Sequence, residues 1–387
     1  MFPVTVTKRG ADRIRAGHLW IYRSDVVGPV DAAGGSVVIV RDQSGNLVGQ
    51  ALFSDASEIS LRFLTRTEEP IDREWWRRRI LDAAARRRTI TSDTNAYRLV
   101  HSEGDLLPSL IIDRYDNILV MQTLSQGTDA VKLMLVEILV EEFAPRAVLE
   151  RNDVRVRAIE GLPLTAGTLH GEFSGELEVI QNGVRYLVAP LSSQKTGLFL
   201  DQRENHLAAR DLARGRALDC FTFSGGFALS LAAGCESVIG IDISGDAIQT
   251  ARRNAELNHS VNVEFREANV FDALRDLETA GEKFDTIVLD PPAFAKNRAS
   301  LKAAVRGYKE INLRALKLLR RDGVLVTCTC SYHVSEEMFL RILAEAANDA
   351  HRRLQLVEKR MQAGDHPVLL GVPETYYLKC VIARVID

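Results

Sequence analysis

The fold is decided by Leu218-Asp219-Cys220-Phe221-Thr222-Phe223-Ser224-Gly225-Gly226. An apolar strand expected at 217–221 leads into this loop, and Gly225-Gly226 lets the backbone turn tightly before a helix expected at 227–233. Strands and helices then alternate: we expect strands at 237–242, 263–267, 284–289 and 323–328, and helices at 247–257 and 304–319. Such alternation indicates right-handed βαβ units in a mainly parallel sheet, with ligands outside the carboxyl ends of the strands.

A carboxylate ends each of the first two expected strands. Asp219 ends the first, and Asp242 ends the second, 17 residues after Gly225, close to the spacing at which an acidic side chain meets ribose hydroxyls. The loop is not GxGxxG, which disfavours a dinucleotide pyrophosphate. A carboxylate beside the loop suits a cationic sulfonium or amino acid moiety better than a phosphate.

Two further strand ends carry chemistry. The third leads into Glu267-Ala268-Asn269-Val270-Phe271, which by position borders an adenine ring, with a surface turn as the alternative. The fourth ends in Asp290-Pro291-Pro292-Ala293-Phe294, whose prolines fix the backbone and hold the carboxylate and the aromatic ring over the cleft. Together these motifs resemble the class I methyltransferases that depend on S-adenosylmethionine. The resemblance covers roughly the last half of the chain and implies that cofactor.

The strand expected at 323–328 leads into two cysteines, Cys328 and Cys330, which point to the same face. Methylating carbon 5 of a pyrimidine requires a nucleophile at carbon 6, because carbon 5 is otherwise too weakly nucleophilic, and a cysteine thiolate is the usual choice. Thr329-Cys330-Ser331 followed by Glu336-Glu337 resembles the catalytic cysteine motif of RNA cytosine-C5 methyltransferases. The alternative is a buried strand cysteine.

Composition describes a globular protein of two or three domains. Of 387 residues, 46% are hydrophobic and 26% charged, and the net charge is −3, which excludes a disordered chain. The absence of a long apolar run makes the cytoplasm the simplest location. Five scattered cysteines indicate neither a disulfide framework nor a zinc site.

The front of the chain reads as a small β domain, residues 1–70, with strands expected at 36–40, 47–53 and 59–64. A helix is expected at 72–89, with Trp76, Ile80 and Ala84 on one face. Arginines cover its other faces: Arg77, Arg78, Arg79, Arg86, Arg87 and Arg88. These side chains belong either to a solvated linker helix or to a surface that contacts phosphates.

A middle α+β domain is expected over residues 71–189, this helix included, and the catalytic domain over 190–387. The middle domain is indicated by two apolar strands flanking residues 113–117, a helix at 130–143 and a strand at 147–150. A hairpin follows, in which Asn182-Gly183 joins strands at 177–181 and 185–188.

Nearly the whole chain resembles the bacterial large-subunit (23S) ribosomal RNA cytosine-C5 methyltransferases. Many RNA cytosine-C5 enzymes carry a second cysteine directly after the proline, where this chain has Pro292-Ala293; this bacterial family resembles the chain in retaining only the later cysteine. The resemblance also rests on three further segments: Gly17-His18-Leu19-Trp20, Glu150-Arg151-Asn152-Asp153 with Glu160-Gly161-Leu162-Pro163, and Lys195 to Asn205. It implies a front PUA fold, an RNA-binding pseudobarrel, and ribosomal RNA or an assembling large subunit as partner. Trp20 is expected in the barrel core, and Asp201 with Glu204 has the spacing of a helix capping box. The oligomeric state stays open, a homodimer included.

The resemblance also implies roles for individual residues. Cys330 adds to carbon 6 of an unstacked cytosine, and Asp290 hydrogen-bonds its N3 and N4 edge. The base that removes the carbon 5 proton is left open among Cys328, water and the loop near Asp365-His366. Predicted cofactor contacts are Asp219, Phe221, Ser224, Gly225, Gly226, Asp242, Asn269, Gln202 and Asp290.

Two other functions stay open. Asp-Pro-Pro-x-Phe also resembles methyltransferases of exocyclic amines, and an enzyme of that kind would modify N2 of guanine in ribosomal RNA without a thiol. An RNA-binding ribosome-assembly factor that has lost activity is the third candidate.

Overall fold

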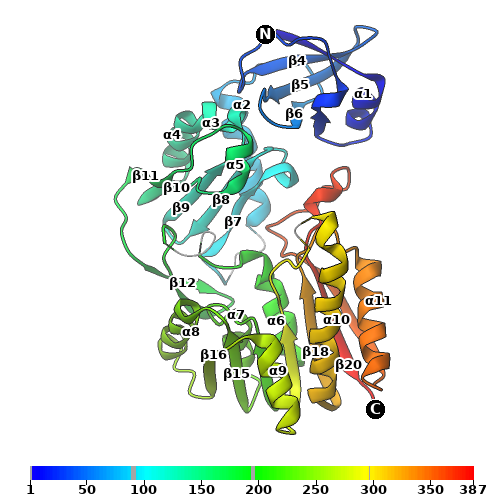
Figure 1. Ribbon diagram of the computed structural model, residues 1–387. Coiled ribbons are helices and arrows are strands. Elements are labelled where there is room, and N and C mark those ends of the chain that lie inside the picture. Colours follow the sequence, from blue (N-terminus) through cyan, green and yellow to red (C-terminus); the bar gives the residue numbers. More distant parts are fainter. Residues whose placement is uncertain (1, 89–92, 193–196, 296) are drawn as a thin grey trace. The chain divides into compact units, whose positions relative to one another are not determined.

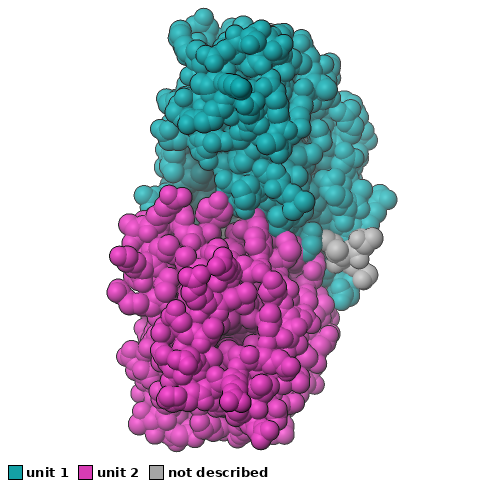
Figure 2. Space-filling model, turned by 90° about the vertical axis from the view of Figure 1, so that its right-hand side faces the viewer, with its two compact units in different colours: residues 1–179, 188–197, 364–375 teal, residues 180–187, 198–363, 376–387 magenta. Residues whose placement is uncertain are grey.

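The computed structural model describes residues 2–88, 93–192, 197–295 and 297–387. Two compact units divide the chain: residues 1–179, 188–197 and 364–375 form the first, and residues 180–187, 198–363 and 376–387 form the second. Figure 2 shows their surfaces in teal and magenta. The three expected domain boundaries stay a prediction.

The first unit begins with a six-stranded sheet in the order β2-β6-β5-β4-β1-β3. Its elements are β1 (Phe2–Val6), α1 (Lys8–Arg15), β2 (Trp20–Tyr22), β3 (Val26–Val27), β4 (Val37–Asp42), β5 (Leu47–Phe53) and β6 (Ile59–Thr65). Inward-facing residues such as Val4, Val38 and Phe63 form its core. Trp20 lies outside that core, contrary to expectation, because its indole is only partly buried and donates to Glu103 Oε1 at 2.9 Å.

A five-stranded sheet follows, in the order β11-β10-β9-β8-β7. Its elements are α2 (Arg73–Arg87), β7 (Ala96–His101), β8 (Leu110–Tyr115), β9 (Ile118–Thr123), α3 (Gln126–Ala130), α4 (Lys132–Phe143), β10 (Ala147–Arg151), α5 (Arg155–Ile159) and β11 (Ala166–Gly171). Helices α2 and α4 contact each other (Figure 1) and contribute Trp75, Trp76 and Leu139 to one apolar core with the sheet.

The arginines of α2 are largely engaged within the protein. Arg87 is 2% exposed, which corrects its expected place on an outer face, because its guanidinium pairs with the buried Asp105. Arg77 pairs with Glu142 at 2.5 Å, and Arg78 with Glu69 at 3.2 Å. These ion pairs weaken the interpretation of the helix as a phosphate-binding surface.

The second unit is built on a seven-stranded sheet in the order β16-β15-β14-β17-β18-β20-β19. Its elements are α6 (Arg203–Leu212), β14 (Arg216–Cys220), α7 (Gly226–Ala232), β15 (Ser237–Asp242), α8 (Gly245–Leu257), β16 (Val263–Glu267), α9 (Val270–Thr279), β17 (Phe284–Leu289), α10 (Leu301–Leu318), β18 (Leu319–Thr329), α11 (Glu336–Asp349), β19 (Leu354–Met361) and β20 (Lys379–Val385). β14 to β18 pair in parallel, and β20 lies antiparallel between β18 and β19.

The expected strands and helices of this sheet are confirmed, and so is the hairpin of β12 (Leu177–Gln181) and β13 (Val184–Val188). Its turn residues Asn182 and Gly183 have φ values of 54° and 76°, as a type I′ turn requires. Helices α9, α10 and α11 pack on one face of the sheet (Figure 1). Strand order reverses between β14 and β17, so the loops at their carboxyl ends frame a binding crevice.

None of the helices that the structure describes has the length and apolar character that a bilayer crossing requires.

Candidate functional site

The loop between β14 and α7 holds a strained backbone. Phe221 and Phe223 have φ values of 66° and 50°, a region that costs energy for residues with a side chain. Gly225 has a φ of 90°, and a Cβ there would lie 3.0 Å from the Phe265 ring. A Cβ on Gly226 would lie 2.8 Å from His206, so this glycine serves the packing of α7 on α6. Such strain is typical of a loop shaped for a ligand.

Asp219 is a buried carboxylate, 1% exposed, with one unsatisfied oxygen. Oδ2 accepts from Thr222 Oγ1 at 2.6 Å and from the Ala228 amide at 2.9 Å. Oδ1 has no hydrogen-bond partner among the described residues. Burial raises the pKa of Asp219 to about 7, although the Thr222 and Ala228 bonds lower it. A buried acceptor without a donor fits a ligand that brings an ammonium group.

Asp242 holds the same loop from the neighbouring strand. Its Oδ2 accepts from the Phe223 amide at 2.9 Å, and its Oδ1 accepts from the Ser244 amide at 2.9 Å. Each carboxylate oxygen retains a further lone pair. Asp242 is therefore placed to fix the loop and still accept hydroxyl donors.

Three other residues predicted from the sequence have structural roles. Gln202 is 2% exposed; its side chain accepts from Asn205 at 2.6 Å and hydrogen-bonds Cys328. Asn269 is exposed and caps α9 by accepting from the Phe271 amide at 2.9 Å. The Ser224 carbonyl accepts from Asn254 at 3.0 Å. Their contact with a cofactor stays a prediction.

The prediction of a capping box between Asp201 and Glu204 is wrong. The N-cap of α6 is Gln202, without a side-chain cap, and Asp201 Oδ2 accepts instead from the Tyr377 hydroxyl at 2.7 Å. Two residues of the neighbouring sequence segment, Lys195 and Thr196, lie outside the described residues.

The ends of β17 and β18 are tied together around Cys330. The Asp290 amide donates to the Cys220 carbonyl at 3.3 Å, which joins β17 to β14. Beyond it, the Ala295 amide donates to Ser331 Oγ at 3.1 Å. The motif containing Asp290 and the strand end containing Cys330 therefore form one edge of the crevice.

Tyr308 of α10 braces both neighbours of Cys330, a role that no sequence motif indicated. Its hydroxyl accepts from Thr329 Oγ1 at 2.8 Å and lies 2.9 Å from Ser331 Oγ. All three side chains are fully buried. Cys330 therefore projects from a backbone that is fixed on both sides.

Cys330 differs from the other cysteines in its exposure. It is partly exposed, whereas Cys220, Cys235, Cys328 and Cys380 are buried. Burial, and then the Cys380 thiol, raise the pKa of Cys328 well above its ordinary value, so this thiol stays protonated at neutral pH. Of the two strand-end cysteines, Cys330 is the accessible one.

Phe294 packs within the protein instead of standing free over the crevice. Its ring centroid lies 4.7 Å from that of Tyr308, 6.0 Å from Phe271 and 6.4 Å from Phe221. A partly buried ring in such a cluster is poorly placed to stack on a base.

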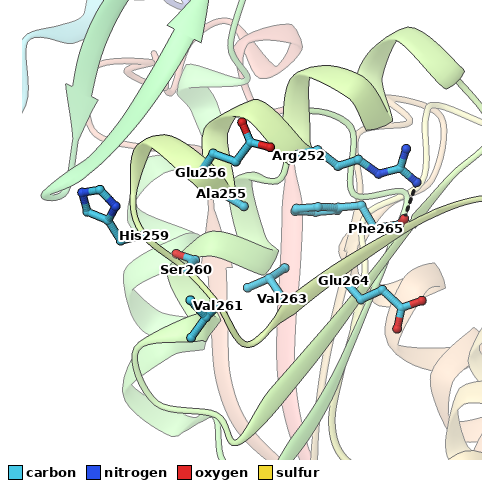
Figure 3. A pocket seen from close by; sticks show the side chains of 9 residues that line it. All are labelled: Arg252, Ala255, Glu256, His259, Ser260, Val261, Val263, Glu264 and Phe265. Carbon is cyan, nitrogen blue, oxygen red and sulfur yellow. Dashed lines mark hydrogen bonds between the residues drawn. The ribbon is translucent and has the colours of Figure 1, made fainter.

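A separate hollow of about 680 Å³ lies along α8 and the edge strand β16 (Figure 3). Arg252, Glu256 and His259 line it, together with Phe265, whose carbonyl accepts from Arg252 at 2.9 Å. None of the predicted site residues lines it. This hollow is therefore separate from the predicted site.

Two families of known proteins match parts of this chain. A PUA-like domain matches residues 4–66, and an S-adenosylmethionine-dependent methyltransferase matches residues 159–379. The ribosomal RNA large subunit methyltransferase I of Shewanella amazonensis is 42% identical over 377 residues, 95% of each chain. That of Tolumonas auensis is 41% identical over 380 residues, covering 95% of this chain and 96% of the other.

A solved structure described as a methyltransferase complexed with SAH shares the fold, with a TM-score of 0.86 at 18% identity and complete coverage of both chains. The predicted front pseudobarrel, the Rossmann-like catalytic fold and the S-adenosylmethionine cofactor are thus confirmed. The chain belongs to the ribosomal RNA large subunit methyltransferase I family of S-adenosylmethionine-dependent methyltransferases.

Proposed function

We propose that this protein methylates carbon 5 of a cytosine in large-subunit (23S) ribosomal RNA through a covalent bond between Cys330 Sγ and carbon 6. The observation that carries the proposal is the position of Cys330. Cys330 follows β18 directly, its thiol is partly exposed, and the next residue, Ser331, accepts a hydrogen bond from the Ala295 amide of the Asp290 loop. The relatives at 41–42% identity are named as ribosomal RNA large subunit methyltransferases, which supports the choice of RNA.

The residues proposed to hold the cofactor are Asp219, Phe221, Ser224, Gly225, Gly226, Asp242, Asn269, Gln202 and Asp290. Among them, the unsatisfied Oδ1 of Asp219 fits the ammonium of the amino acid moiety, and Asp242 fits the ribose. Bound there, the cofactor supplies an electrophilic methyl group on a sulfonium sulfur.

The protein's own groups then prepare the base. The Cys330 thiolate forms the S–C6 bond, and the electron pair of the C5–C6 double bond shifts onto carbon 5, which becomes nucleophilic. Asp290 hydrogen-bonds the N3 and N4 edge. After methylation, loss of the carbon 5 proton restores the double bond and expels the thiolate. A protonated Cys328 cannot take that proton. Asp365 and His366 are buried within the first unit, where Asp365 accepts from the Arg98 amide, so water is the candidate acceptor.

RNA containing 5-fluorocytosine tests the covalent step, because fluorine at carbon 5 prevents the final loss of a proton. We expect a protein–RNA complex that survives denaturing electrophoresis and whose linked peptide contains Cys330. Methylation of guanine N2 needs no thiol, and the packing of Phe294 disfavours it. Methyl transfer to RNA without any covalent adduct through Cys330 would contradict the cytosine mechanism. A methylguanine product would establish methylation of guanine N2 instead.

Cofactor affinity should depend on pH through Asp219. Its pKa is raised to about 7, so the unliganded fold is more stable with the acid protonated, and this contribution is lost as the pH rises through about 7. A ligand ammonium prefers the carboxylate. Below pH 7, S-adenosylhomocysteine affinity should therefore fall by up to about tenfold per pH unit. Calorimetry at pH 6, 7 and 8 measures this.

The control for that measurement is Asp219→Asn, which should bind more weakly and without this pH dependence. A wild-type affinity that stays constant from pH 6 to 8 would contradict the proposed contact.

A further inference from the structure

A buried lysine lies one strand away from the proposed nucleophile and has no carboxylate partner among the described residues. Lys379 begins β20 and pairs in register with Thr329, the residue before Cys330. It is 3% exposed. Its Nζ lies 3.4 Å from the Tyr377 carbonyl and 5.1 Å from the centroid of the Tyr376 ring. An ammonium has three donors, and this one makes a single long hydrogen bond within the part of the chain that the structure describes.

No carboxylate oxygen of the described residues lies within 4.0 Å of that ammonium. Glu336, at the start of α11, is already engaged on both oxygens. Its Oε1 accepts from Lys359 Nζ at 2.6 Å, and its Oε2 accepts from the Tyr376 hydroxyl at 2.9 Å. Burial and Glu336 raise the pKa of Tyr376, so its phenol stays neutral and adds no counter-charge. The charge of Lys379 is therefore left for another anion.

The charges around this corner identify that anion. Burial lowers the pKa of Lys379, while Cys330 and then Glu336 raise it. The titratable groups around this corner include three acidic ones, Glu336 from α11, Tyr308 from α10 and Asp290 after β17, and the cation Lys359, which is paired with Glu336. Acidic neighbours disfavour a thiolate, and a desolvated cation favours it.

We propose that Lys379 is the counter-ion that keeps Cys330 in its thiolate form. This role rests on the function proposed above, in which Cys330 attacks carbon 6. Lys379 forms no covalent bond in that sequence: it stabilises the sulfur anion before addition and again when elimination releases it. It is a positioning residue that acts through Cys330.

Alkylation of the unliganded full-length protein by iodoacetamide tests the pair, because only the thiolate reacts quickly. The rate at Cys330 is followed from pH 5.5 to 9.5 by peptide mass spectrometry. In Lys379→Gln we expect the midpoint of the pH profile to rise by about one unit and the rate at pH 7 to fall about tenfold. Lys379→Arg keeps the cation and should stay within a few-fold of wild type.

Lys317→Gln is the matched control, because Lys317 lies near the end of α10 and pairs with Glu278 and not with Glu336, and its midpoint should not move. Binding of S-adenosylhomocysteine verifies that each variant is folded. Lys379→Met, which keeps the buried stem and removes only the charge, replaces the glutamine variant if that one fails to fold. A folded uncharged variant with the wild-type midpoint would overturn the proposal.

The alkylation experiment needs no RNA, so its outcome is separable from that of the proposed function. A shifted midpoint together with no 5-fluorocytosine adduct would keep the Lys379–Cys330 pair and remove the cytosine chemistry.

Discussion

Cys330→Ala is expected to abolish methyl transfer to RNA, by a factor on the order of 10⁴ or more, while S-adenosylhomocysteine binding stays unchanged. Without the sulfur nucleophile, carbon 5 of cytosine has no source of electron density. The proposed cofactor site is built on Asp219 and Asp242, whose hydrogen bonds to the loop after β14 do not involve Cys330. Transfer of labelled methyl groups to RNA and calorimetric binding of S-adenosylhomocysteine measure the two effects.

Cys235→Ala is the matched control for that variant. Cys235 is a buried cysteine of the same unit. It precedes β15 and therefore lies at the amino edge of the sheet, away from the strand ends that carry the proposed site. It should retain full transfer. Substantial formation of 5-methylcytosine by Cys330→Ala would rule out the covalent mechanism.

Most of the catalytic fold is predictable because its signals are local. β14, β15, β17 and β18 each contain a short apolar run, and β16 alternates apolar and charged residues. In a parallel sheet the carboxyl ends of such strands meet at one edge. That rule alone brings Asp219, Asp242, Asp290 and Cys330 together from residues spread over more than a hundred positions. The strands, and the edge of the sheet at which the predicted site lies, can therefore be predicted from the apolar pattern and from the turn residues that bound each strand.

The supporting residues are not predictable in this way. Tyr308 and Lys379 are brought to the residues that flank Cys330 only by the packing of α10 and the pairing of β20, and neither belongs to a motif. Gln202 and Asn269 are predicted cofactor contacts, and the hydrogen bonds that they make within the fold are likewise not indicated by any motif. Tertiary contacts decide such roles, and a sequence pattern does not contain them.

In helix α2, too, the sequence pattern does not predict which charged side chain is buried. A run of arginines indicates a solvated face, but Arg87 is buried because it pairs with Asp105, which lies 18 residues later in the sequence. Two hydrogen bonds of 2.6 and 2.5 Å join the guanidinium to both carboxylate oxygens, and a third of 2.8 Å reaches the Asp365 carbonyl. Arg87 thereby links α2, the segment after β7 and the returning segment 364–375.

Arg87→Met should lower the unfolding free energy of the first unit by about 3–5 kcal/mol, because it leaves the fully buried Asp105 without its main counter-charge. Urea unfolding followed by tryptophan fluorescence measures this selectively, since all three tryptophans (Trp20, Trp75 and Trp76) belong to that unit. The second unit contributes no signal to the transition.

Arg78→Met provides the control from the same helix. Arg78 pairs with Glu69 at 3.2 Å, but its side chain is 55% exposed, and exposed ion pairs contribute roughly 0–1 kcal/mol. The urea midpoint of Arg78→Met should stay close to that of the wild type, although the substitution removes the same charge from the same helix. The two variants thus separate a structural arginine from a phosphate-binding one: equal midpoints, with equal losses of RNA affinity, would return Arg87 to the RNA-facing role that its burial argues against.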